Sequence, residues 1–164
     1  MSEPWVEAVH DDAFNTDYRE KVIRLIELSR DEIIAIVGEI GVYRFADVRW
    51  SLENALDAGR KIRILASESK ADRYVVGRLV DLGAELYLSG SEPIEKYMVV
   101  DRKHWFGRSA VERVGEIHWN DTDGAMKIAT KFEEDIKKVK QIPTNFDSGE
   151  DPLLKEVNHI SAGQ

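Results

Sequence analysis

Lys96 and Asp101 stand five residues apart in the segment Lys-Tyr-Met-Val-Val-Asp, and Ile94 lies two residues before the lysine. This spacing resembles that of a phosphate-handling active site. In such a site a nucleophilic histidine would stand at position 94, but isoleucine has no nitrogen to attack phosphorus and no proton to give. We therefore expect the remains of a phosphate-handling site that has lost its chemistry.

Two other histidines could replace the missing nucleophile. His104 follows Asp101 in a predicted turn, and His118 lies on a later predicted strand. Side-chain alternation gives positions 94, 96, 98 and 100 one face of their strand, and we expect neither histidine to share that face with Lys96. We favour the alternative interpretation, in which His104 is a surface turn residue and His118 a hydrogen-bonded strand residue.

Lys96 and Asp101 also have a structural interpretation, as two charges at the carboxyl end of a buried strand that pair with each other, or with Lys96 held by carbonyl groups. The functional interpretation is a retained anion site. It places Lys96, Ser109 and Arg44 around a phosphate or carboxylate, in the cleft outside the strand ends where open α/β sheets bind ligands. Two loop residues after the first predicted strand could line the same cleft: Glu39 and Tyr43.

Composition narrows the class of protein. The chain has 164 residues, a net charge of −8 and no cysteine. The acidic balance disfavours a nucleic-acid partner. The absence of cysteine excludes disulfides and thiolate metal sites and suits a reducing compartment. The N-terminus has neither a basic start nor an apolar run, and no stretch approaches about 18 apolar residues, so we predict a cytoplasmic protein away from membranes.

Nothing in the sequence indicates a metal or a nucleotide cofactor. The segment Asn120-Asp121-Thr122-Asp123-Gly124 could suggest a calcium loop, but its frame places Trp119 and Thr130 where carboxylates are required. We interpret it as the capped start of the final helix, with Asp121 or Thr122 accepting backbone amide hydrogen bonds.

The elements that would hold the candidate residues alternate between helix and strand. Apolar residues at helical spacing predict helices over residues 17–29, 45–56 and 71–82, the last two ended by Gly59 and Gly83. Short β-branched runs predict strands over 32–37, 61–66 and 85–88. Strands joined through helices by short connections imply parallel pairing with right-handed crossovers.

The order changes after Gly90. Strands are predicted over 94–100 and then over 105–106 or 115–119 with no helix between them, so we expect mixed or antiparallel pairing there. A last amphipathic helix runs from Thr122 to about Lys140. We predict an irregular N-terminal extension over 1–16, one domain over 17–140, and over 141–164 an extended tail or partner-docking segment.

The frame from Ile94 to Asp101, with Gly107-Arg108-Ser109 downstream, resembles the motif of the phospholipase D superfamily, which is His-x-Lys-x-x-x-x-Asp on a central strand followed by a Gly-Ser pair. The spacing alone is common, and the order of elements around it carries the resemblance. The surrounding segments that look like parts of the family are 57–65, a helix end and second strand; 79–88, a helix-strand junction; and 132–137, a closing helix.

The resemblance implies an α/β fold, a phospholipase D-like three-layer sandwich with a mixed, mainly parallel central sheet flanked by helices. In the family one histidine forms a phosphohistidine, a second protonates the leaving group, the lysine neutralises phosphate oxygens, and the aspartate supports the histidine. Two motif copies meet at one site. This chain has one copy, so a site of that kind would form across a homodimer, and with Ile94 the inherited mechanism cannot run.

We therefore favour a non-catalytic phospholipase D-like domain that binds a small anionic ligand, regulates, or mediates assembly with a regulatory protein partner. It would be similar to the sensor domains of archaeal sugar-responsive transcription regulators. The alternatives are a phosphodiesterase or nuclease whose site is completed across a dimer, and a purely structural subunit with a vestigial cleft.

Trp50 stands apart from the apolar stripe of its predicted helix. An aromatic residue outside the stripe can mark a dimer contact. The alternative is lateral packing against the neighbouring helix.

Overall fold

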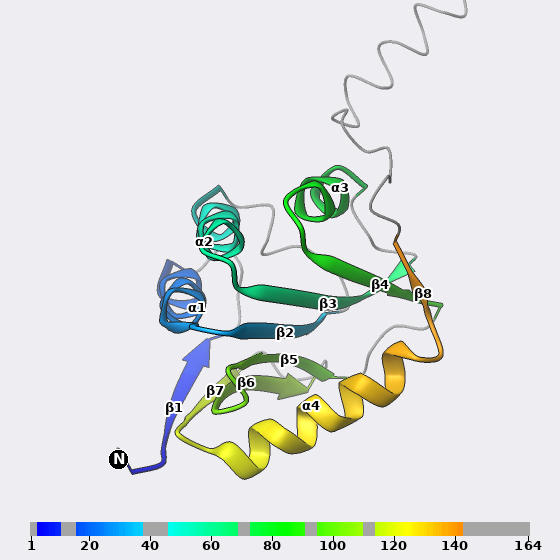
Figure 1. The fold of residues 1–164 in the computed structure, drawn as a ribbon. Coiled ribbons are helices and arrows are strands. Elements are labelled where there is room, and N and C mark those ends of the chain that lie inside the picture. Colours follow the sequence, from blue (N-terminus) through cyan, green and yellow to red (C-terminus); the bar gives the residue numbers. More distant parts are fainter. Residues whose placement is uncertain are drawn as a thin grey trace, which may run out of the picture.

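The structure is a computed structural model that describes residues 3–10, 16–37, 46–68, 73–90, 95–109 and 114–142. It has three layers (Figure 1), as predicted: helices α1 to α3 cover one face of a sheet and α4 covers the other. The helices are α1 (Thr16–Leu28), α2 (Ala46–Asp57), α3 (Arg73–Asp81) and α4 (Thr122–Ile136).

The sheet has eight strands in the order β1-β7-β6-β5-β2-β3-β4-β8. The strands are β1 (Trp5–His10), β2 (Glu32–Val37), β3 (Lys61–Ser67), β4 (Glu85–Ser89), β5 (Glu95–Val100), β6 (His104–Ser109), β7 (Val114–Trp119) and β8 (Lys140–Gln141). Only β2–β3 and β3–β4 are parallel among the described pairs. The expectation of a mainly parallel sheet is wrong, because the chain returns through β5, β6 and β7 as an antiparallel meander.

The two ends of the sheet also differ from the prediction. Residues Trp5–His10, expected to be irregular, form β1 and pair antiparallel with β7. The last helix ends at Ile136, earlier than predicted, and Lys140–Gln141 then pairs with β4. Residues 143–164 lie outside the described part of the chain.

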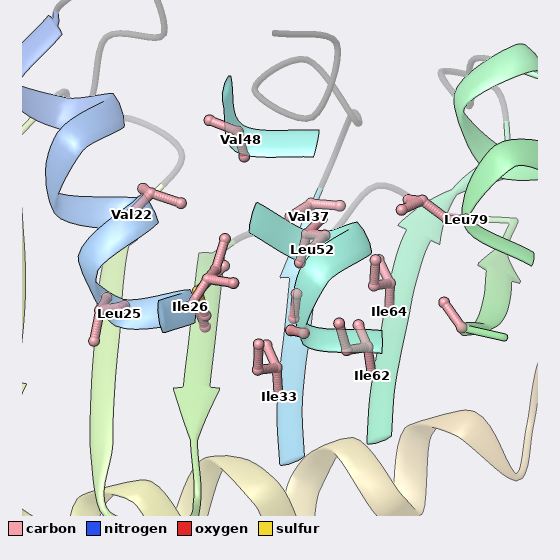
Figure 2. Close-up of a cluster of buried hydrophobic side chains, with 14 of the residues drawn as sticks. Val22, Leu25, Ile26, Ile33, Val37, Val48, Leu52, Ile62, Ile64 and Leu79 are labelled. Carbon is pink, nitrogen blue, oxygen red and sulfur yellow. The ribbon is translucent and has the colours of Figure 1, made fainter. Parts of the chain in front are cut away.

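Each face of the sheet has its own apolar core. Under α1, α2 and α3, the alternate residues Ile33, Ala35 and Val37 of β2 pack against the stripes of the helices. Figure 2 shows this core, with Leu25 and Ile26 of α1 beside the strands. On the other face, Ile34 and Ile36 pack with residues of α4. Because both faces are covered, β2 is a continuous apolar run, as is usual for buried strands.

No helix in the described ranges is long and apolar enough to cross a membrane.

Candidate functional site

Lys96 lies near the start of β5 on the face covered by α1, as side-chain alternation predicts. Its Nζ is 5.9 Å from the centroid of the Tyr18 ring on α1. Beside it is a cavity of about 10 Å³, lined by apolar and aromatic side chains together with the lysine. A volume of that size holds about one water molecule. Ile94, two residues earlier, lies outside the described residues.

Asp101 lies in the turn that follows β5, at the opposite end of the strand from Lys96. Five residues of strand correspond to about 16 Å, so the predicted pairing of Lys96 with Asp101 is wrong. The Asp101 carboxylate instead accepts hydrogen bonds from the backbone N–H groups of Arg30, Asp31 and Glu32, at 2.9, 2.9 and 3.0 Å. It therefore holds the turn that leads from α1 into β2.

Asp101 has a positive φ of 55°, a conformation that aspartate tolerates better than most residues. Its own N–H donates to the carbonyl of Glu32 at 3.0 Å. At this end of the two strands, Asp101 therefore both accepts hydrogen bonds from the residues that enter β2 and donates one to Glu32.

Gly107 on β6 is required by the packing of aromatic side chains. A Cβ atom at this position would lie 2.7 Å from Trp105 and 2.8 Å from Tyr97. These two rings pack against each other with centroids 6.1 Å apart. The packing of these rings therefore explains the glycine of the downstream Gly-Arg-Ser segment without a ligand.

Among the other predicted anion-site residues, the structure describes only the backbone of Ser109. The register pairs Lys96 with Arg108 and Glu95 with Ser109, so the backbone of Ser109 lies at the Lys96 end of β5. The Ser109 side chain is outside the described residues, as are Glu39, Tyr43 and Arg44. The structure thus brings the Ser109 backbone near Lys96 and keeps Asp101 away.

His104 begins β6 and is half-buried, so its prediction as a surface turn residue is wrong. Its Nδ1 accepts a hydrogen bond from the backbone N–H of Asn120 at 2.9 Å. Burial lowers the pKa of His104, and the nearby Lys103 lowers it further. The register pairs His104 with Val100, which places it on the same sheet face as Lys96, contrary to the prediction, but at the other end of the strand.

His118 lies on the face of the sheet covered by α4, away from Lys96, as predicted. Its ring stacks on Trp105 with centroids 3.9 Å apart and planes 5° apart. Its Nε2 lies 3.0 Å from Glu116 Oε2. The interpretation as a hydrogen-bonded strand residue is confirmed, and neither histidine lies where it could replace the nucleophile next to Lys96.

Solved structures with the same architecture identify the fold. Nuc from Salmonella typhimurium, a phospholipase D family member, aligns with a TM-score of 0.67 and 17% identity over 85% of this chain and 99% of its own. The chain has a phospholipase D-like fold. NucT from Helicobacter pylori aligns with a TM-score of 0.65 and 14% identity, over 85% of this chain and 100% of its own.

A third similar structure is that of a chromatin protein. TrmBL2, an archaeal chromatin protein with a novel mode of DNA binding, aligns with a TM-score of 0.64 and 18% identity over 86% of this chain. This chain spans 55% of TrmBL2. No protein-family model matches the sequence, and no curated protein matches it at a significant level. The phospholipase D-like fold is therefore recognised from the arrangement of helices and strands and not from a match of the sequence.

The phospholipase D-like sheet also carries a partly buried charge cluster that the sequence analysis did not single out. Arg63 of β3 is 6% exposed and its Nη2 contacts Glu133 of α4, while Glu32 Oε2 lies 3.6 Å away. The Arg63 hydrogen bond lowers the pKa of Glu133. Arg102 completes the cluster, 3.4 Å from Glu133 Oε1. Both carboxylates are ion-paired, so the cluster fastens α4 to the sheet.

A signal for this cluster is present in the sequence. An arginine stands in the middle of the otherwise apolar strand Ile62-Arg63-Ile64-Leu65. A charge in such a strand is almost always paired when buried. Its partners are not predictable, because Glu133 lies 70 residues further along the chain.

Proposed function

We propose that this chain is a non-catalytic phospholipase D-like module that acts by regulation or assembly with a protein partner. One observation carries the proposal: neither candidate histidine lies beside Lys96, because His104 is at the other end of the strand and His118 stacks on Trp105 on the other face of the sheet. With Ile94 at the histidine position, the frame contains no nucleophile. Asp101 and Gly107 of the frame have structural roles.

One of the similar structures supports a role outside catalysis by analogy. TrmBL2 is a chromatin protein that binds DNA, so the phospholipase D-like fold also occurs in a chromatin protein. A net charge of −8 opposes direct contact of this chain with DNA, which favours action through a partner. The absence of cysteine suits a cytoplasmic location. A homodimer remains a prediction.

The assembly form is favoured over a small-ligand form at Lys96. Pockets for small ligands have volumes of about 300–1,000 Å³, whereas the cavity beside Lys96 measures about 10 Å³. The small size of this cavity also fits the purely structural subunit as a second candidate. Crystals grown with phosphate would decide: an anion held by Lys96 and Ser109 would favour the ligand form, and an apolar wall would favour the other two.

The test of the non-catalytic proposal is hydrolysis of bis(p-nitrophenyl) phosphate by the full chain. We expect no hydrolysis above the background rate. The matched variants are Lys96→Ala and His104→Ala, both of which should give the same background. Hydrolysis by the unchanged chain that disappears in either variant would overturn the proposal and favour the phosphodiesterase completed across a dimer.

A further inference from the structure

Trp50 is the most exposed large apolar residue in the described part of the chain, with 62% of its surface accessible. It lies on α2, whose buried residues are Val48, Ser51, Leu52 and Ala55. A helix turns by about 100° per residue, so Trp50 points about 200° away from Val48 and directly away from the sheet. The prediction of lateral packing against a neighbouring helix is therefore wrong.

The position of Trp50 on the molecule is central. α2 lies between α1 and α3 in the helix layer (Figure 1). Ion pairs connect it to both neighbours, Arg19–Asp47 at 4.0 Å and Arg78–Glu53 at 2.9 Å. The indole thus stands in the middle of one broad face of the protein. A desolvated tryptophan at the centre of a contact surface is a common source of binding energy.

The surroundings of Trp50 are acidic. Asp57 lies two helical turns further along α2 on the same side, and it is exposed. The outward sides of the flanking helices carry three more exposed carboxylates, Glu20, Glu27 and Asp81. Two exposed arginines of these helices are ion-paired: Arg24 pairs with Glu7 at 2.8 Å and Arg78 with Glu53 at 2.9 Å. α2 itself has one basic residue, Arg49.

We propose that this face, Trp50 with Asp57, Glu20, Glu27 and Asp81, binds an arginine- or lysine-rich segment of another protein. The inference rests on the proposed function as an assembly module and names the chemistry of its partner. A tryptophan face attracts a guanidinium or ammonium group, and the surrounding carboxylates complement the remaining positive charges.

Charge decides against the other occupants of this face. A second copy related by two-fold symmetry would place the acidic rims of both copies against each other, which costs free energy. Nucleic acids and anionic membranes would meet the same repulsion. A basic protein segment is the occupant whose charge and aromatic preference both match.

The experiment uses the full chain and three fluorescently labelled synthetic helical peptides of equal length, made from leucine and alanine with arginine, lysine or glutamate. Binding is measured by fluorescence anisotropy. The variants are Trp50→Ala and Asp57→Lys, and the matched control is Trp5→Ala, another exposed tryptophan, 53% accessible, at the edge of the sheet. Because both variant positions are exposed, circular dichroism should show an unchanged fold.

We expect the arginine peptide to bind most tightly, the lysine peptide less tightly and the glutamate peptide not at all. Trp50→Ala and Asp57→Lys should each weaken arginine-peptide binding by about tenfold or more, and Trp5→Ala by less than about twofold. Equal binding of the arginine peptide to Trp50→Ala and to the unchanged chain would overturn the proposal, because the peptide would then be attracted by overall charge and not by Trp50. So would concentration-dependent dimerisation that Trp50→Ala abolishes. Neither result would touch the non-catalytic proposal, which depends on hydrolysis alone.

Discussion

At the scale of single residues, Asp101 shows how one motif position can be retained for structural reasons. Its carboxylate accepts hydrogen bonds from three backbone N–H groups at the entry to β2. A lysine and an aspartate at this spacing therefore do not by themselves indicate a surviving site. Here the two side chains lie at opposite ends of β5.

Replacing Asp101 should destabilise the protein without any ligand being involved. Asp101→Ala removes the acceptor for three amides and puts an alanine at positive φ, and we expect the free energy of unfolding to fall by about 1–3 kcal/mol. Asp101→Asn keeps one acceptor oxygen and tolerates the conformation, so its loss should be smaller. Urea unfolding measures both. An Asp101→Ala variant as stable as the unchanged chain would contradict this role.

Tyr87 gives a prediction for alkaline pH. Burial raises the pKa of Tyr87 to about 12, helped by its hydrogen bond to Glu85 at 2.9 Å. The folded state thus holds the phenolic proton more tightly than the unfolded state. The resulting stability is fully present below the ordinary pKa of about 10 and is lost as the pH rises toward 12.

Ultraviolet absorbance of tyrosinate checks this prediction. We expect a late step in the titration, from Tyr87. Tyr87→Phe should remove the late step, and Glu85→Gln should move it to lower pH because the neighbouring negative charge is gone. Tyr74→Phe is the control and should leave the late step in place. A late step that survives Tyr87→Phe would assign it to another residue.

At the scale of elements, the start of α4 is fixed by a compact arrangement of polar groups. Asp121 caps the helix through a hydrogen bond from the Gly124 N–H at 3.1 Å and also accepts the Trp105 indole N–H at 2.9 Å. The indole hydrogen bond lowers the pKa of Asp121. The carboxylate therefore stays charged in neutral solution and joins α4 to β6.

Gly124 is the residue that makes room for this cap. A Cβ atom there would lie 2.3 Å from Asp121 Oδ2 and 2.6 Å from Trp105 Nε1. Gly124→Ala should break one or both hydrogen bonds and lower the free energy of unfolding by about 1–3 kcal/mol, although alanine favours helices. Gly90→Ala is the matched control, because its Cβ would have nothing within 4 Å. Thermal unfolding that ranks the two variants in the opposite order would refute this account.

At the scale of the whole molecule, the predictable features are those with a local cause. The strand Glu32–Val37 was predicted with its observed bounds, because burial on both faces produces an unbroken β-branched run. The helices follow from their apolar stripes, and Gly59 and Gly83 end two of them with φ of 87° and 109°. Asp121 as the cap of α4 is likewise visible from local sequence.

The features that could not be predicted depend on distant segments. β1 exists because Trp5 pairs with Trp119 in β7, more than a hundred residues away, and nothing near Trp5 announces that partner. The site was misjudged for this reason too, since the amides that occupy Asp101 come from the start of β2. The antiparallel pairing of β5, β6 and β7, by contrast, was expected, because these strands follow one another with no helix between them.

The two cores share one sheet, which leads to a prediction for the molecule as a unit. Leu25 in the core under α1 to α3 and Phe132 in the core under α4 both have 0% exposure. Leu25→Ala should cost about 2–5 kcal/mol and Phe132→Ala about 3–5 kcal/mol in free energy of unfolding.

Because β2 contributes side chains to both cores, loss on either face weakens the same strand. We expect a single transition in each variant, with circular dichroism and tryptophan fluorescence coinciding. Separate melting of α4 in Phe132→Ala would mean that the sheet does not couple its two faces.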